Sequence, residues 1–184
     1  RDDVESRGLG DVYKRQSMNR AIYLANVLGV DMGMYYKRLD YSRYVNGRHP
    51  IAAYEFLGPK IEGKDMILID DMISSGESML EVAAALKERK ANKIFVFSTF
   101  GLFTNGLDKF DKAYENGIID KVLTTNLIYQ TPELLQREWY INCDMSKYIA
   151  YIIDTLNHDS SISDLLNPNE RIQNIVAKYK TGEL

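Results

Sequence analysis

The sequence predicts an α/β domain in which an open parallel sheet carries helices on both of its faces. Residues 66–69 and 94–97 are continuously apolar, which is typical of parallel strands buried on both faces. Apolar residues at helical spacing lie between these segments, and strand and helix patterns continue to alternate after them. With 184 residues and 45% hydrophobic content, the chain can bury one substantial core. Such sheets bind their ligands at the carboxyl ends of the strands.

Residues 1–16 differ from the rest of the chain. They show neither helical nor strand periodicity, and the segment RGLGDVYKRQ within them resembles translated adapter sequence. We interpret residues 1–16 as a non-native or disordered segment, and we assign the predicted domain to residues 17–184. An ordinary disordered terminus is the alternative interpretation.

The amino-terminal part of the domain is predicted to form a helix, a strand and a long polar excursion. Apolar residues recur at helical spacing over residues 21–28, and Gly29 provides a stop signal. A strand over residues 32–36 follows. Residues 37–63 are polar and basic with interspersed glycine and proline, and long excursions of this kind are often functional flaps. The strand over residues 66–69 is then the best candidate for the centre of the sheet.

The remainder of the chain continues the alternation of helices and strands. Apolar stripes mark each helix, and Asn167 followed by Pro168 is a favourable start for the last one. The expected elements are a helix over 79–90, a strand over 94–97, a helix over 107–114, strands over 122–125 and 140–142, and helices over 145–156 and 167–179.

Composition and charge exclude several classes of function. The net charge is −3 and the pI is about 5.5, so no overall positive field attracts nucleic acid or an anionic membrane surface. Cys143 is the only cysteine, and His49 and His158 have no metal-ligand spacing, which excludes a disulfide and a cysteine-rich metal site. No apolar run is long enough to cross a bilayer. We expect a cytoplasmic protein that binds neither nucleic acid nor membranes.

The segment over residues 67–79 contains the residue types that bind a sugar phosphate. A buried strand leads to Asp70 and Asp71, whose carboxylates can accept hydrogen bonds from sugar hydroxyls, directly or through Mg²⁺. Gly76 permits a tight turn, after which unpaired backbone N–H groups at a helix start can hold a phosphate dianion. The hydroxyls of the same turn belong to Ser74, Ser75 and Ser78.

A structural explanation competes with this interpretation. Ser74 and Glu77 have the spacing of a capping box, in which the serine caps the helix and the glutamate bonds back to the serine N–H. A capping box is common and indicates no function. It does not explain the two carboxylates between an apolar strand and the cap, so the pattern favours sugar-phosphate binding.

The loop resembles the phosphoribosyl-binding loop of type I phosphoribosyltransferase folds, and most closely that of ribose-phosphate diphosphokinases. The similarity covers about residues 17–166 and matches the carboxyl-terminal half of that family. Besides Asp70-Asp71-Met72-Ile73, the similar segments are Arg20-Ala21, Lys37-Arg38, Glu62-Gly-Lys-Asp65, Ser98-Thr-Phe-Gly-Leu-Phe103 and Ser160-Ser-Ile-Ser163.

This resemblance implies transfer of the β,γ-diphosphoryl group of ATP to the 1-hydroxyl of ribose 5-phosphate, with Mg²⁺ as cofactor. By resemblance, the cations Lys37 and Arg38 neutralise charge on the group in transfer, and the family's homo-oligomeric assembly is expected as well. Asp70 and Asp71 would hold the ribose hydroxyls, directly or through a Mg²⁺ ion that their carboxylates bind. The residues implied to hold the 5-phosphate are Ser74, Ser75, Gly76, Glu77 and Ser78.

Four positions depart from the family pattern. Ser74 stands where many members have an acidic residue, and Glu77-Ser78 stands where they have Gly-Thr. Leu39 stands where the basic loop usually has a second arginine, and Glu77 would repel phosphate unless it turned away. The family's amino-terminal half, with most of its ATP-binding residues, also has no counterpart in residues 1–16. We therefore expect this chain alone to be inactive. The alternatives are a base-salvaging phosphoribosyltransferase and a catalytically silent regulatory paralogue.

Overall fold

The computed structural model describes residues 21–39, 51–163 and 167–183, with the backbone alone for residues 36–39 and 51–55. Residues 1–16, interpreted above as non-native or disordered, lie outside the described residues. Four strands form the main sheet: β3 (Met66–Ile73), β4 (Ile94–Gly101), β5 (Lys121–Thr125) and β6 (Tyr140–Cys143). They are parallel and lie in the order β3-β4-β5-β6.

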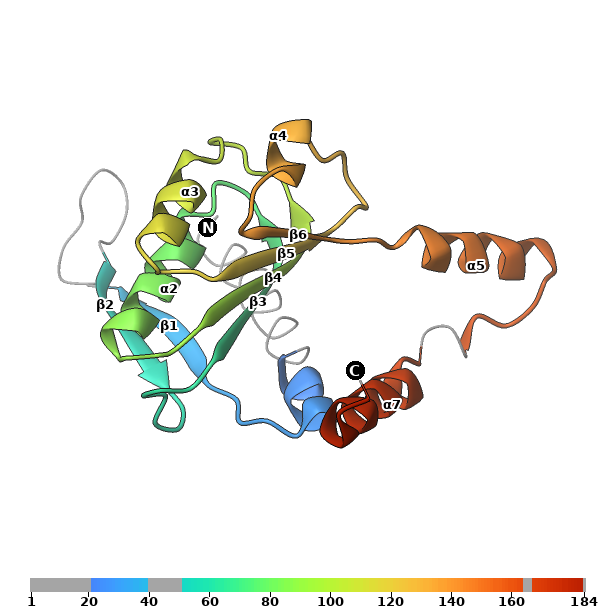
Figure 1. Ribbon diagram of the computed structural model, residues 1–184, viewed down its shortest axis with the longest axis horizontal. Coiled ribbons are helices and arrows are strands. Elements are labelled where there is room, and N and C mark those ends of the chain that lie inside the picture. The colour runs from blue at the N-terminus through green and yellow to red at the C-terminus, as the bar shows by residue number, and fades with distance from the viewer. Residues whose placement is uncertain (1–20, 40–50, 164–166, 184) are drawn as a thin grey trace, which may run out of the picture.

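Helices connect the consecutive strands of this sheet, as the alternating pattern predicts (Figure 1). Parallel neighbours require crossover connections, and helices provide them. The connecting helices are α2 (Glu77–Glu88), α3 (Asp108–Glu115) and the short α4 (Pro132–Leu135). The predicted α/β class with a parallel sheet flanked by helices is confirmed, although α4, a single turn capped by the Thr131 hydroxyl, was not predicted.

The core lies between one face of the sheet and helices α2 and α3. Ala83 and Leu86 of α2 are buried with the strand residues Ile94, Val96 and Val122. At the other end of the core, aromatic rings pack together: Phe110 stacks on Trp139 with ring centroids 5.4 Å apart. The remaining rings of this aromatic cluster are Phe103 and Tyr140.

The long polar excursion contains a strand that the sequence analysis did not predict. β1 (Met34–Leu39) pairs antiparallel with β2 (Ile51–Leu57) to form a separate two-stranded sheet. The predicted strand over residues 32–36 therefore starts later and continues further than expected. Pairing across the hairpin, a non-local contact, extends β1 into residues whose basic composition argued for a loop.

β3 lies at the edge of the sheet described, so its predicted central position was wrong. Burial of this strand on both faces was also wrong, because Ile67 is 54% exposed. Residues in parallel register share a face, which places Ile69, Phe97, Leu123 and Ile141 in one apolar row across the second face of the sheet. Phe97 and Ile141 of this row are 37% and 40% exposed.

Further helices of the described residues lie away from the core (Figure 1). Residues 21–28 are helical and stop at Gly29, as predicted, and α5 (Ser146–Asn157) and α7 (Asn169–Thr181) also match their predicted positions. Within the described residues, no side chain of α5 or α7 is fully buried. None of the described helices combines the length and the apolar character needed to cross a membrane.

We predict that Phe110→Ala lowers the free energy of unfolding by about 3–5 kcal/mol, because Phe110 is fully buried and its removal opens a cavity. Urea denaturation measures the change. Tyr129→Ala is the control, since Tyr129 is 81% exposed and its loss should change stability by less than about 0.5 kcal/mol. Equal effects of the two substitutions would contradict the placement of the core.

Candidate functional site

The predicted site residues of the loop come together on one strand-turn-helix unit. Asp70 and Asp71 lie in the second half of β3, which continues to Ile73 and so extends beyond the predicted strand end. A turn over residues 74–76 follows, and α2 begins directly after it at Glu77. The structure therefore places the two carboxylates and the serine-rich turn at the carboxyl edge of the sheet, where ligands of such folds bind.

The turn presents unpaired amides. Gly76 has φ of 78°, and its carbonyl accepts hydrogen bonds from the Met79 and Leu80 amides at 3.1 and 2.9 Å, which starts the helix. Within the described part of the chain, the amides of Ser75 and Gly76 donate to no protein acceptor. Free amides at the positive end of a helix dipole form a binding site for an anion.

The segment after β4 holds this turn in place. The Leu102 amide donates to the Ile73 carbonyl at 2.8 Å, and the Thr104 amide donates to the Ser74 carbonyl at 3.0 Å. Both bonds occupy carbonyls of the turn and leave its amides for a ligand. Residues 98–103 resemble the family in sequence, but these two hydrogen bonds were not predicted, because contacts between distant backbone segments leave no local signal.

Phe110 of α3 supports the turn from beneath. A Cβ built on Gly76 would lie 2.2 Å from Cζ of Phe110, closer than any side chain tolerates. Gly76 is therefore required twice, by its left-handed backbone and by the ring against it. The sequence signalled the first requirement, and the fold adds the second.

Asp70 lies partly buried, and its carboxylate accepts a hydrogen bond from the Asp71 amide at 2.8 Å. Burial raises the pKa of Asp70, the Asp71 amide bond lowers it in part, and the charge of Asp71 adds a smaller increase. Successive strand residues point to opposite faces, so Asp70 and Asp71 approach the carboxyl edge of the sheet from its two sides. No group of three or more metal-ligating side chains occurs among the residues described.

Glu77 turns toward α3, where its carboxylate forms an ion pair with Lys109. The hydrogen bond and the charge of Lys109 lower the pKa of Glu77. The capping box considered for Ser74 and Glu77 is wrong, since the N-cap is Gly76 and no side chain caps the helix. The pairing residue Lys109 was not predicted, because it lies 32 residues away in sequence.

Lys37 and Arg38 lie within β1, whereas the sequence predicted them in a loop that follows a strand. Their backbones pair with Tyr54 and Ala53 of β2, and the register shifts immediately after Arg38. Their side chains are outside the described residues. Their catalytic role stays a prediction.

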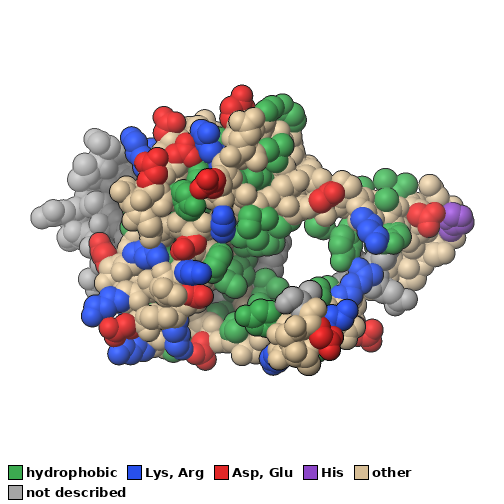
Figure 2. Space-filling model, viewed as in Figure 1, with side chains coloured by type: hydrophobic (Ala, Val, Ile, Leu, Met, Phe, Trp, Pro, Cys, Tyr) green, Lys and Arg blue, Asp and Glu red, His purple; other side chains and the backbone are tan. Residues whose placement is uncertain are grey.

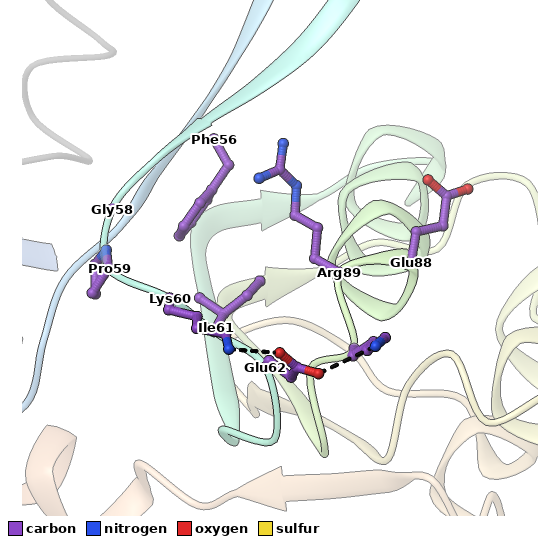
Figure 3. Close-up of a pocket in the computed structure, with 9 residues that line it drawn as sticks. Phe56, Gly58, Pro59, Lys60, Ile61, Glu62, Glu88 and Arg89 are labelled. Carbon is purple, nitrogen blue, oxygen red and sulfur yellow. Dashed lines mark hydrogen bonds and ion pairs between the residues drawn. The ribbon is translucent and has the colours of Figure 1, made fainter.

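A cavity of about 420 Å³ lies at the opposite edge of the sheet from this turn (Figure 3). It is bounded by the end of β2 and the carboxyl end of α2, and the Arg89 guanidinium lies over the Phe56 ring at 5.6 Å. Glu62 is paired there with Lys60 at 2.8 Å and with Lys90 at 3.2 Å. Since helix α2 runs back along the sheet, this cavity is separate from the candidate site.

The fold and the strand-turn-helix unit together define a domain of the type I phosphoribosyltransferase class. Its fold is similar to the crystal structure of phosphoribosylpyrophosphate synthetase from Mycobacterium smegmatis, with a TM-score of 0.52, 19% identity, and coverage of 60% of this chain and 36% of that one. The family described as phosphoribosyl synthetase-associated domain matches residues 50–167. The chain belongs to this family.

Two curated relatives carry the name ribose-phosphate pyrophosphokinase, a synonym of ribose-phosphate diphosphokinase. The one from Shewanella oneidensis is 32% identical over 107 residues, covering 58% of this chain and 33% of the relative. The one from Vibrio parahaemolyticus is 28% identical over 172 residues, covering 90% of this chain and 51% of the relative. The family resemblance predicted from sequence is confirmed, and the chain spans about half or less of the length of these relatives.

We predict that Gly76→Ala destabilises the fold more than Gly106→Ala. Both glycines have φ of 78°, so both substitutions incur the same left-handed backbone cost, but only the methyl group at position 76 would clash, because nothing lies within 4 Å of a Cβ at Gly106. The difference should be about 1–3 kcal/mol in the free energy of unfolding, measured by urea denaturation. Equal losses would contradict the contact with Phe110.

We predict that Asp70→Asn stabilises the fold at pH 7. The pKa of Asp70 is raised because burial disfavours its ionised form in the folded state. The ionised carboxylate therefore lowers the free energy of unfolding at pH values above the folded-state pKa. As the pH falls through that pKa toward the ordinary range of aspartate, the wild-type residue is protonated and the difference between the two proteins should shrink. Urea midpoints as a function of pH measure it, with the exposed Glu88→Gln as control. A difference that grows on acidification would contradict the burial of Asp70.

Proposed function

We propose that this chain is the ribose-5-phosphate-binding part of a ribose-phosphate diphosphokinase. The observation that carries the proposal is the pair of unbonded amides at Ser75 and Gly76, at the start of α2 and next to the carboxylates of β3. The family match over residues 50–167 supports it. Residues 17–184 would form one lobe of a longer cytoplasmic enzyme.

In the proposed reaction, the 1-hydroxyl of ribose 5-phosphate attacks the β-phosphorus of ATP, and AMP leaves with the electron pair of the broken bond. The residues of this lobe position the acceptor. The turn over residues 74–76 and the first two residues of α2 would hold the 5-phosphate by amides and hydroxyls, while Asp70 and Asp71 would accept hydrogen bonds from the ribose hydroxyls. Lys37 and Arg38 would neutralise charge on the group in transfer.

The donor set fits Mg²⁺ as the proposed cofactor. Magnesium in such sites uses one or two carboxylates and completes its shell with substrate phosphates and water, so the absence of a larger ligand cluster in the described residues is compatible with it. Asp70 or Asp71 would be its ligand. When bound, Mg²⁺ would neutralise negative charge on the ATP phosphates.

We also propose that the complete protein is a homo-oligomer. The second face of the sheet carries the row of Ile69, Phe97, Leu123 and Ile141, of which Phe97 and Ile141 are exposed. Hydrophobic side chains also line both sides of the opening between the sheet and the arm formed by α5 and α7 (Figure 2). Exposed apolar surface of this kind typically marks an interface.

Two alternative functions compete with this proposal. A base-salvaging phosphoribosyltransferase would bind the same sugar phosphate, but the family match favours the diphosphokinase. A silent paralogue was suggested by Leu39 and Glu77. Glu77 is accounted for by its ion pair with Lys109, so of these two residues only Leu39 still supports the silent paralogue.

We predict that ribose 5-phosphate shifts the amide resonances of Ser75, Gly76 and Ser78 in an NMR titration of the chain. The amides that bond the phosphate should move most, whereas that of Gly106, which has the same φ but lies outside the turn, should stay in place. Unmoved loop resonances in a folded sample would end the proposal.

We predict that the purified chain alone releases no AMP from ATP and ribose 5-phosphate, because it spans at most about half of its relatives. An ATP-dependent product from the chain would contradict this.

In a full-length version, Leu39→Arg should raise AMP release, since it adds a cation to the loop beside the transferred group. Absence of activity with either residue would favour the silent paralogue.

A further inference from the structure

Glu77 creates an electrostatic problem for the site proposed above. It is the first residue of α2 and directly follows Gly76, whose amide would bond the phosphate. A carboxylate at this position repels a phosphate dianion, and a glutamate side chain is ionised at neutral pH. A chain that binds phosphate here must neutralise this charge or direct it away.

We propose that Lys109 is a positioning residue that sets the affinity of the turn for phosphate by holding and neutralising Glu77. This inference rests on the proposed function. Lys109 lies in the first turn of α3, and its ammonium pairs with the Glu77 carboxylate. The ion pair directs the carboxylate toward α3 and leaves no net charge on the two side chains beside the turn.

The fold couples Lys109 to the turn. Phe110, the next residue of α3, is fully buried and packs directly against Gly76. Earlier in the same connection, the Thr104 amide bonds to the Ser74 carbonyl. Because both contacts tie the segment over residues 104–110 to the turn, Lys109 is held where it meets Glu77.

A role in stability alone does not explain this pair well. The Lys109 and Glu77 side chains are 52% and 51% exposed, and pairs this exposed contribute little to the free energy of unfolding. Either charge alone would still act on an anion bound next to Gly76, since Glu77 is the adjacent residue and charges closer than a Debye length of about 10 Å are only partly screened.

The test is the affinity for ribose 5-phosphate, measured by calorimetry on the full chain for the wild type, Lys109→Ala, Glu77→Gln and the double variant. Lys109→Ala should weaken binding about three- to tenfold, because it leaves the carboxylate unpaired beside the phosphate. Glu77→Gln should bind as tightly as the wild type or more tightly. The double variant should recover wild-type affinity within about twofold, and the loss in Lys109→Ala should shrink in high salt.

Two controls separate charge from structure. Lys112→Ala removes an exposed cation from the same helix and should leave the affinity unchanged, whereas Lys109→Arg should retain it. Thermal midpoints of all variants check that they fold. If Lys109→Ala and Glu77→Gln weaken binding equally, the pair is structural and the inference is overturned. If the wild type itself binds no ribose 5-phosphate, the proposed function fails, and this inference fails with it.

Discussion

The contact between the Phe110 ring and the bare backbone of Gly76 is the constraint on which the rest of the site depends. It joins the aromatic cluster of the core to the turn between β3 and α2. The position of the turn follows from the packing of a buried ring, which few alternative arrangements satisfy. A binding turn built on a rigid core element is already arranged before its ligand arrives, so little ordering is required on binding.

The hydrogen bonds around the turn complete this arrangement. The segment after β4 occupies the carbonyls of Ile73 and Ser74, and the helix start occupies that of Gly76. Within the described residues the amides of Ser75 and Gly76 have no protein acceptor, and the partly buried acid Asp70 precedes them on β3. A group that combines a phosphate with hydroxyls satisfies both parts. Glu77 fits this picture only because α3 supplies Lys109, so α3 provides both a ring and a cation to the same turn.

The apolar second face of the sheet is a different kind of constraint. The strands of the sheet carry apolar residues on both faces, yet within the described residues only one of the two faces is closely packed. A continuous apolar run in the sequence predicts that both faces of a strand are buried. It does not indicate whether a helix, a neighbouring lobe or a second copy of the chain covers each face. The chain matches about half or less of its relatives' length.

The sequence by itself determined the α/β class, most of the helices and strands, and the serine- and glycine-containing turn before α2, because these depend on local periodicity, glycine and serine. The tertiary structure alone decided the edge position of β3, the pairing of β1 with β2, and the partner of Glu77. Each of these joins segments distant in the chain, and the residues concerned carry no local mark of the partner they will meet. The capping box was wrong for this reason: local spacing permitted it, but a lysine 32 residues away bound the same carboxylate.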